Sequence, residues 1–231
     1  MPSHHTVFLR EFVRNYQTTG AVAPSSRWLA KALTRALAEP GPAPQRRAVL
    51  EVGPGTGAVT QQLVTRLAPH DRLTLVELND TFVAHLRARF ANDPAWKEAA
   101  PRTEIVHDRL ENLDPSVRFD VIVSGLPLNN FSIEQVADII ATFRRLLAPN
   151  GVLSFFEYMA IRRARCVVGR PSDRERMQGI SRVVNELLID GQARREWVWV
   201  NMPPAWVYHV SGSCATSGLS PDQVPQSTSS A

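Results

Sequence analysis

Short apolar runs alternate with longer stretches of helical spacing through most of the chain after residue 47. The apolar runs end at turn-forming residues, which is typical of strands. The stretches between them repeat their apolar positions every three to four residues, as an amphipathic helix does. We expect strands over residues 48–52, 72–77, 104–106, 119–123 and 152–158, and helices over residues 58–67, 81–90 and 132–147. This alternation predicts an α/β fold.

The C-terminal part of the chain adds a helix and a pair of strands. A basic helical stretch covers residues 172–189, and Gly191 follows it as a stop signal. Two apolar runs, 197–200 and 206–210, are joined through Pro203-Pro204 and are close enough to pair antiparallel. The whole pattern predicts a doubly wound, Rossmann-like sheet of seven strands. Such sheets bind ligands at the carboxyl ends of their strands, near the topological switch point.

Proline and glycine divide the chain into segments. Residues 40–46 carry three prolines and a glycine and are predicted to be a linker. Residues 1–46 are therefore expected to form an N-terminal helical segment, and residues 47–211 the main domain. Residues 212–231 are rich in Ser, Thr, Gly and Pro, so we expect a disordered tail there.

Charge is modest in total but unevenly distributed. The 231 residues carry a net charge of +4, with +5 in residues 1–47 and +4 in residues 157–182, which leaves −5 elsewhere. Two basic segments on an acidic body favour a polyanionic partner, either nucleic acid or anionic lipid. Solvated helix faces would give the same distribution.

Several classes of protein are disfavoured by the sequence. No apolar run reaches the roughly 18 to 20 residues that span a bilayer, and charges interrupt the N-terminus where a secretory signal would be apolar. Cys166 and Cys214 lie too far apart to suggest a disulfide framework or a zinc site, and no metal is expected. A cytoplasmic protein is the expectation.

The tract Glu51-Val-Gly-Pro-Gly-Thr-Gly57 lies between a predicted strand and a predicted helix. Its glycines permit tight turns, and the helix that follows offers free N–H groups to an anion. Glu51 can pair with the amino group of a methionine moiety, and Glu77, at the end of the next strand, can accept hydrogen bonds from both ribose hydroxyls. These two acids favour S-adenosylmethionine, with S-adenosylhomocysteine as product, over a dinucleotide. An oxidoreductase and a non-catalytic relic remain alternatives.

Asp108 follows the third predicted strand. It could accept a hydrogen bond from the adenine amino group. It could equally cap the turn over residues 110–113, and the two roles are compatible.

The fourth predicted strand ends in Ser124-Gly-Leu-Pro-Leu128. In adenine dimethyltransferases of ribosomal RNA this position reads Asn-Leu-Pro-Tyr, where the Asn grips the target amine and the aromatic ring stacks on the base. Gly125 and Leu128 replace those residues here. Stacking and edge contacts are the expected sources of affinity for a flipped base, so their absence counts against RNA.

The chain resembles the bacterial phospholipid N-methyltransferases, which convert phosphatidylethanolamine to phosphatidylcholine, and their relatives that methylate ornithine lipids. The likeness covers most of residues 5–210. It rests on Thr19-Gly-Ala-Val-Ala-Pro-Ser-Ser26, on the fourth-strand tract, and on a basic stretch from Tyr158 to Arg176 that includes Arg162, Arg163 and Arg165. The tract Asn129-Asn130-Phe131 departs from the family pattern, which bears on head-group selection.

The resemblance and the glycine tract together imply a set of cofactor-binding residues. They are Gly20, Ala21, Ser25, Ser26, Glu51, Gly53, Gly55, Thr56, Gly57, Glu77, Leu78, Asp108, Arg109, Ser124, Gly125 and Leu126.

Membrane contact is expected at the N-terminus. Five apolar or aromatic residues of the stretch 8–16 fall within about 140° of helix circumference, with Arg10 and Arg14 outside that arc. Such a helix can lie in the interface of an anionic bilayer, with residues 162–176 as a second anchor. It would also serve as a lid, leaving residues 20–26 to close over the cofactor. Packing on its own domain is the alternative.

The chemistry of methyl transfer depends mainly on positioning. Tyr16 and Tyr158 could orient the N–H of the substrate amine, and the ring of Phe131 could stabilise its growing positive charge. Each aromatic could instead be ordinary core or membrane contact. His107 is more simply a structural residue at a strand end, and His209 a packing residue.

The sequence therefore predicts a membrane-associated N-methyltransferase that acts on the amino head group of phosphatidylethanolamine or ornithine lipid, at the inner face of the membrane. Its expected partners are an anionic membrane surface and the aminolipid, with no nucleic acid and no obligate protein partner. One alternative is an enzyme like the ribosomal RNA adenine N6-dimethyltransferases. Another is a non-catalytic module that binds membranes or S-adenosylhomocysteine.

Overall fold

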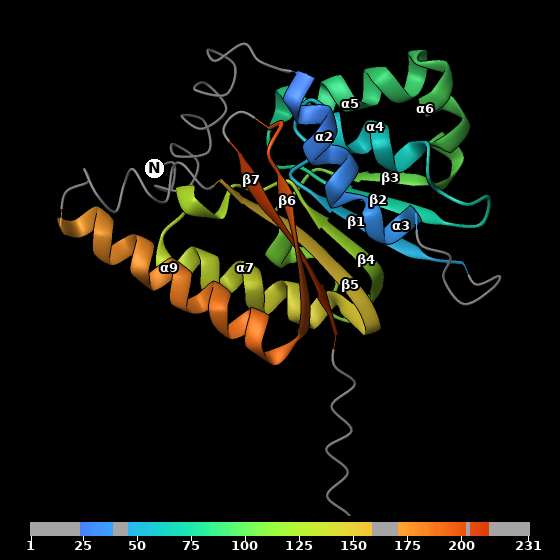
Figure 1. Ribbon diagram of the computed structural model, residues 1–231. Helices are drawn as coiled ribbons and strands as arrows, with labels where there is room; N and C mark the ends of the chain where they lie inside the picture. Colours follow the sequence, from blue (N-terminus) through green and yellow to red (C-terminus); the bar gives the residue numbers. More distant parts are fainter. Residues whose placement is uncertain (1–23, 39–45, 159–170, 202–203, 213–231) are drawn as a thin grey trace, which may run out of the picture.

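A seven-stranded sheet organises the protein in the computed structural model, which describes residues 24–38, 46–158, 171–201 and 204–212 (Figure 1). The strand order is β3-β2-β1-β4-β5-β7-β6. The strands are β1 (Ala48–Val52), β2 (Arg72–Val76), β3 (Thr103–Val106), β4 (Phe119–Ser124), β5 (Leu147–Tyr158), β6 (Gln192–Val198) and β7 (Ala205–Ser211). Strands β1 to β5 are parallel, whereas β7 is antiparallel to both β5 and β6. The predicted Rossmann-like fold is confirmed.

Helices cover both faces of this sheet (Figure 1). One face packs against α7 (Ile133–Leu146) and α9 (Pro171–Asp190). The other packs against α2 (Pro24–Leu33), α3 (Arg35–Ala38), α4 (Ala58–Val64), α5 (Asp80–Asn92) and α6 (Pro94–Ala99). Short 3-10 turns, η1 (Ala100–Arg102), η2 (Leu110–Asn112) and η3 (Leu128–Asn130), complete the described elements. None of the described helices combines the length and apolar character needed to cross a bilayer.

Strand β1 lies at the centre of the sheet and is buried on both sides. Val49 contributes to the cluster under α2 and α4, and Leu50 to the cluster under α7 and α9. A parallel strand covered by helices on both faces needs apolar residues at successive positions, which explains the continuous apolar run. The order of the strands reverses between β1 and β4, and the loops that follow these two strands therefore diverge at the switch point.

The structure corrects several predicted boundaries. Strand β5 begins at Leu147 rather than at Val152, because the turn residues 148–151 form an irregularity inside the strand, between the pairs Phe119–Leu147 and Val121–Val152. Strand β6 covers residues 192–198 rather than 197–200. It is an edge strand with exposed polar side chains, so it carries little apolar signal. Helix α6 was not predicted at all.

The N-terminal segment is partly integrated into the domain. Leu29 and Leu33 of α2 and Leu37 of α3 are buried in the same cluster as Val49. Residues 24–38 therefore share the core of the sheet. The predicted amphipathic helix over residues 8–16 and the basic residues 162–165 lie outside the described residues. So do all but residue 46 of the predicted linker over 40–46 and all but residue 212 of the predicted tail over 212–231.

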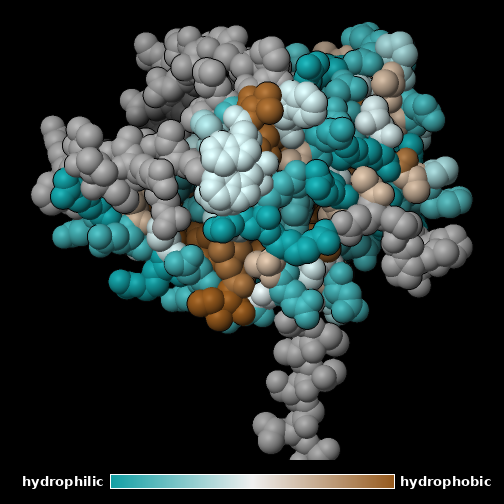
Figure 2. All heavy atoms as spheres, viewed as in Figure 1, coloured by the Kyte–Doolittle hydropathy of each residue, from teal (hydrophilic) through white to brown (hydrophobic). Residues whose placement is uncertain are grey.

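The face of the molecule in Figure 2 is mainly hydrophilic, and pale and brown side chains interrupt it in a few places. The large apolar side chains exposed among the described residues are Trp28, Leu78, Val117, Ile189, Trp197, Trp199 and Val200.

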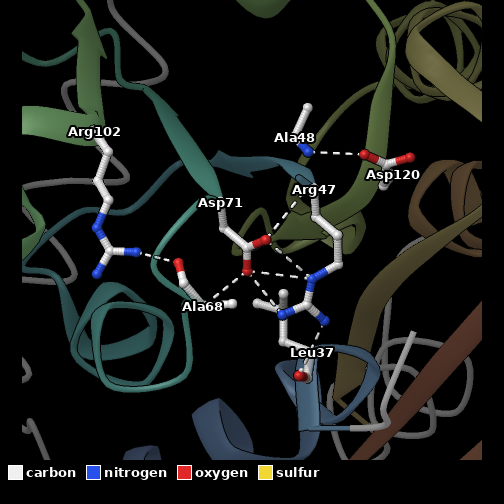
Figure 3. Close-up of polar contacts among 7 residues, drawn as sticks. All are labelled: Leu37, Arg47, Ala48, Ala68, Asp71, Arg102 and Asp120. Carbon is white, nitrogen blue, oxygen red and sulfur yellow. Dashed lines mark hydrogen bonds and ion pairs between the residues drawn. The ribbon is translucent and has the colours of Figure 1, made fainter. Parts of the chain in front are cut away.

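A polar network ties the amino ends of the strands together (Figure 3). Arg47 donates to the buried carboxylate of Asp71 from its backbone N at 3.0 Å and from its guanidinium at 2.8 Å. The same guanidinium donates to the carbonyl of Leu37 at 3.2 Å. Asp120 accepts from the backbone N of Ala48 at 2.8 Å. These bonds join α3, β1, β2 and β4 at the edge opposite the switch point.

Candidate cofactor and active site

A pocket of about 100 Å³ opens at the carboxyl edge of the sheet, on the face that α7 covers. Seven of the residues predicted to bind cofactor or substrate line it: Gly53, Glu77, Leu78, Asp108, Arg109, Leu126 and Phe131. They come from the loops after β1, β2, β3 and β4. The structure thus brings together residues that lie far apart in the sequence.

The glycine loop after β1 adopts the backbone conformation that its composition predicts. Gly53, Gly55 and Gly57 have φ angles of 69°, 56° and 83°, in the left-handed region that favours glycine. A Cβ atom at Gly57 would lie 2.5 Å from the ring of Trp96, so the close approach of this ring also favours glycine at this position. Gly57 directly precedes α4, and the loop therefore presents a helix N-terminus to the site.

The loop after β4 lies directly against the glycine loop. The backbone N of Gly125 donates to the carbonyl of Val52 at 2.8 Å. A Cβ atom at residue 125 would lie 2.7 Å from the carbonyl oxygen of Gly53. Ser124 is buried and its hydroxyl accepts from the backbone N of Leu126 at 3.3 Å. There is no room here for the Asn side chain that the ribosomal RNA enzymes carry at this point.

Glu77 joins the loops after β1 and β2. One carboxylate oxygen accepts from the backbone N of Gly55 at 3.0 Å, and the other from the backbone N of Asn79 at 2.9 Å. Burial raises the pKa of Glu77, and these hydrogen bonds and nearby His107 only partly offset that rise. A carboxylate has about four lone-pair sites, so Glu77 can still accept further bonds. It fits a diol such as ribose.

Glu51 lies on the other face of the sheet from the pocket. Its side chain is fully buried and accepts from the hydroxyl of Thr60 at 2.7 Å. Its second oxygen has no hydrogen-bond partner among the described residues. Burial raises the pKa of Glu51 to about 8, with a further contribution from the charge of Glu77. An unsatisfied buried carboxylate beside the glycine loop fits a cationic amino group, which would stabilise its ionised form.

Asp108, for which the sequence left an adenine contact and a turn cap open, lies at the mouth of the loop after β3. It lines the pocket and is exposed, and it accepts from the backbone N of Arg109 and from the side chain of Asn112, both at 2.7 Å. These bonds lower its pKa. Arg109 lies 3.3 Å from Glu111. His107 is also exposed and lies 3.1 Å from Asp80, where it links β3 to the start of α5.

The predicted catalytic aromatics are separated. Phe131 is almost fully buried and lines the pocket. Tyr158 packs edge-on against Phe156 at 4.9 Å, on the opposite face of the sheet, and does not line the pocket. Tyr16, Gly20 and Ala21 lie outside the described residues.

Five further predicted residues, Ser25, Ser26, Gly55, Thr56 and Gly57, do not line the pocket. Ser25 and Ser26 form the first turn of α2, which packs on α4 and β7. Gly55, Thr56 and Gly57 continue the glycine loop beyond Gly53.

Several residues of the site were not predicted from the sequence. Thr60 holds Glu51 from α4. Gln135 and Ile139, four residues apart on one face of α7, line the pocket together with Val52, Val76, Leu110 and Glu111. The position of Gln135 was indicated by the capping box with Ser132, which places the start of α7 at the end of the β4 loop.

No group of three or more His, Cys, Asp or Glu side chains in the described ranges is placed to hold a metal ion.

The amino-acid sequence matches known methyltransferases. Residues 49–151 match the family described as "Methyltransferase domain". The chain is 31% identical over 153 residues to an ornithine lipid N-methyltransferase from Singulisphaera acidiphila, covering 64% of this chain and 74% of that enzyme. The chain belongs to the bacterial phospholipid and ornithine lipid N-methyltransferase family. This N-methyltransferase homologue is an S-adenosylmethionine-dependent methyltransferase.

More distant relatives share parts of the chain or only its fold. A ribosomal RNA small subunit methyltransferase A from Parasynechococcus marenigrum is 36% identical over 81 residues, which is 35% of this chain and 25% of that enzyme. The O-methyltransferase TomG from Streptomyces achromogenes, in complex with S-adenosylmethionine, superposes with a TM-score of 0.60 at 20% identity, over 83% of this chain and 81% of that one. An O-methyltransferase from Bacillus cereus, in complex with S-adenosylhomocysteine, gives 0.59 at 17% identity over 87% and 90%.

The pocket lies at the edge where open α/β sheets bind their ligands. In the pocket, the carboxylates of Glu77 and Asp108 are acceptors of the kind that hydroxyl and amino groups need, whereas Glu51 lies on the other face of the sheet and does not line the pocket. S-adenosylmethionine supplies an electrophilic methyl group when bound. The protein's contribution is to align the acceptor and exclude water.

Proposed function

We propose that the protein transfers methyl groups to the amine of a membrane aminolipid, either phosphatidylethanolamine or ornithine lipid, while associated with the inner face of the membrane. The observation that carries the proposal is the similarity to an ornithine lipid N-methyltransferase over 74% of that enzyme's length. The similarity to ribosomal RNA enzymes covers only a quarter of their length.

The loop after β4 supports an acceptor other than a nucleobase. Leu128, which stands where the ribosomal RNA enzymes have their stacking aromatic, is buried in the core. A Cβ atom at Gly125 would lie 2.7 Å from the carbonyl oxygen of Gly53, so a side chain there would push the two loops apart. A base entering this site would find neither the stacking ring nor the amide that would grip its amine.

Phe131 is the aromatic that an incoming amine would meet. It lies in the pocket wall, and its backbone carbonyl accepts from the guanidinium of Arg176 at 2.9 Å. Arg176 also binds the carbonyl of Asn129 at 3.1 Å, so α9 fixes the whole turn over residues 129–131. A ring held in this way can stabilise the positive charge that accumulates as an amine is methylated.

The proposal is tested with the full chain, S-adenosylmethionine labelled in its methyl group, and detergent-dispersed phosphatidylethanolamine or ornithine lipid in separate reactions. We expect label in one of the two lipid fractions, and mass spectrometry of the product will count the methyl groups added. The Glu77→Ala variant is the control and should give no labelled lipid. Label in ribosomal RNA with none in either lipid would overturn the proposal.

A further inference from the structure

Three tryptophans gather at the tip of the β6–β7 hairpin. The rings of Trp197 and Trp199 stack with their centroids 4.7 Å apart, and Trp197 also contacts Trp206 on the neighbouring strand. Trp199 and Val200 are 65% and 67% exposed, and Trp197 is 43% exposed. We call Trp197, Trp199, Val200 and Trp206 the hairpin patch. In Figure 2 pale and brown side chains gather where Figure 1 shows the ends of β6 and β7.

The hairpin patch lies at the same edge of the sheet as the pocket. Val198 pairs with Ala205, which in turn pairs with Tyr158 at the carboxyl end of β5. Strand β5 is parallel to β4, whose carboxyl end leads to Leu126 in the pocket. Three strand spacings separate β4 from β6, which corresponds to a lateral distance of about 14 Å. A flat surface that touches the hairpin patch would therefore pass close to the pocket.

Basic side chains lie on the patch and on the helix that packs against its strands. The guanidinium of Arg195 lies 3.9 Å from the ring centroid of Trp206. Helix α2, which packs against β6 and β7, adds a fourth, half-exposed tryptophan, Trp28, flanked by Arg27 and Lys31. Among the described residues beside the patch, Glu196 is paired with Arg35 at 2.7 Å and Glu157 is buried. The charge at the rim is therefore positive and complements an anionic surface.

We propose that the hairpin patch is an interfacial anchor that inserts into the headgroup region of an anionic lipid bilayer and holds the pocket against it. Tryptophan favours this environment because its ring is apolar and its N–H needs a polar partner. Arginine and lysine at the same depth pair with lipid phosphates. This inference rests on the proposed function, because an anchor is useful only if a lipid acceptor must reach the pocket from the bilayer. Its test measures binding and does not require catalysis.

The anchor is tested by sedimentation of the full chain with vesicles of phosphatidylglycerol and phosphatidylcholine. The double variant Trp199→Ser, Val200→Ser changes two of the most exposed apolar side chains and should unfold at the same temperature as the wild type. We expect its partition coefficient to fall at least about tenfold. The matched control is Ile189→Ser. Ile189 is 81% exposed but lies at the end of α9, next to the opposite edge of the sheet, so this variant should bind like the wild type.

Fluorescence adds an independent readout. Lipids brominated near the headgroup should quench the tryptophan emission of the wild type and of Ile189→Ser, and quench the double variant much less. Trp96 is fully buried and should contribute an unquenched background in all three. Methylation of detergent-dispersed aminolipid should be equal in the three proteins, and methylation of the same lipid in vesicles should fall only in the double variant.

The outcomes separate the two proposals. Tryptophan-dependent vesicle binding without methylation of any lipid would leave the anchor standing and refute the proposed function. Equal vesicle binding by the double variant and the wild type, or no vesicle binding by the wild type, would overturn the anchor. Light scattering in the absence of lipid is the last check: a wild-type oligomer that the double variant dissociates would assign the patch to self-association instead.

Discussion

Asp71 and Glu51 are buried carboxylates at opposite edges of the sheet, and their pKa values shift in opposite directions. Asp71, at the amino edge, is desolvated, but the hydrogen bonds from Arg47 and from the backbone N of Ala68 outweigh its burial and lower its pKa. Glu51, at the carboxyl edge, has the hydroxyl and backbone of Thr60 as its hydrogen-bonding partners, and burial raises its pKa to about 8. Both side chains lie at edges of the same sheet, and the hydrogen-bond donors around each one decide the direction of its pKa shift.

This difference separates the structural edge from the functional one. At the amino edge the charges of Arg47 and Asp71 are matched within the chain, which leaves nothing for a ligand to supply (Figure 3). At the carboxyl edge Glu51 keeps an oxygen without a partner among the described residues. Polar groups that the fold leaves incomplete are candidates for ligand binding.

The largest expected effect is on stability, from Asp71→Ala. This change leaves Arg47 without its buried partner and should lower the free energy of unfolding by about 4 kcal/mol. Urea denaturation measures the loss, and calorimetric titration of the folded variant should give an unchanged affinity for S-adenosylmethionine. A clear loss of cofactor affinity in folded protein would show that the two edges are not independent.

The pH dependence of stability should have opposite signs at the two edges. Glu51 keeps its proton in the folded chain up to a pH of about 8, whereas the unfolded chain releases it near the ordinary value of 4.5. Its contribution to the free energy of unfolding is therefore complete below about 4.5 and falls by a few kcal/mol as the pH rises to about 8.

Asp71 behaves in the reverse way. It stabilises the fold above its ordinary pKa of 3.8, and that contribution is lost as the pH falls through its lower folded value. Urea unfolding over a pH series, with Glu51→Gln as the reference for one group and Asp71→Asn for the other, isolates the two slopes. Parallel curves for wild type and Glu51→Gln between pH about 4.5 and about 8 would refute the raised pKa.

Glu77→Gln tests the carboxyl edge directly. The amide loses the charge and one acceptor, so the ribose loses charge-assisted hydrogen bonds, and the dissociation constant of S-adenosylmethionine should rise about 50-fold. Isothermal calorimetry measures the change. Glu104→Gln is a suitable control, because Glu104 is exposed in β3 and should leave affinity unaltered.

The smallest effect comes from the contact between the two loops. Gly125→Ala places a Cβ atom 2.7 Å from the carbonyl oxygen of Gly53 and should reduce stability by about 2 kcal/mol. Gly55→Ala finds Phe82 at 3.9 Å, so its cost is the strain of a positive φ angle, about 1 kcal/mol. Thermal unfolding compares the two variants. An equal or smaller loss for Gly125→Ala would show that the loops separate without cost.

The sequence predicted those parts of the site that depend on position along a strand. The glycine loop after β1, Glu51 near the end of β1, and the acids after β2 and β3 must all lie at one edge of a parallel sheet. Leu126 and Phe131, which line the pocket, were also predicted as site residues, because their loop follows β4 at the switch point.

The sequence could not decide which face a residue takes. Tyr158 follows Phe156 by two positions, so both point toward α2, whereas the pocket opens on the side of α7. Glu51 shares the face of Val49 for the same reason, and Thr60 became its partner only through the packing of α4. Gln135 and Ile139 depended on the rotation of α7 about its axis. The position of β6 was missed because an exposed edge strand is mostly polar.

The reversed direction of β7 has a practical corollary for engineering. Because β7 runs against β5 and β6, the described residues 199–201 follow β6 at the edge that carries the pocket. A continuous register from Gln192–Ser211 to Val198–Ala205 fixes β6 and β7 against each other. Residues 199–201 can thus be exchanged without changing the paired residues of β6 and β7. We expect their exchange to change the surface beside the pocket and to leave the glycine loop unchanged, because that loop follows β1, four strand positions from β6.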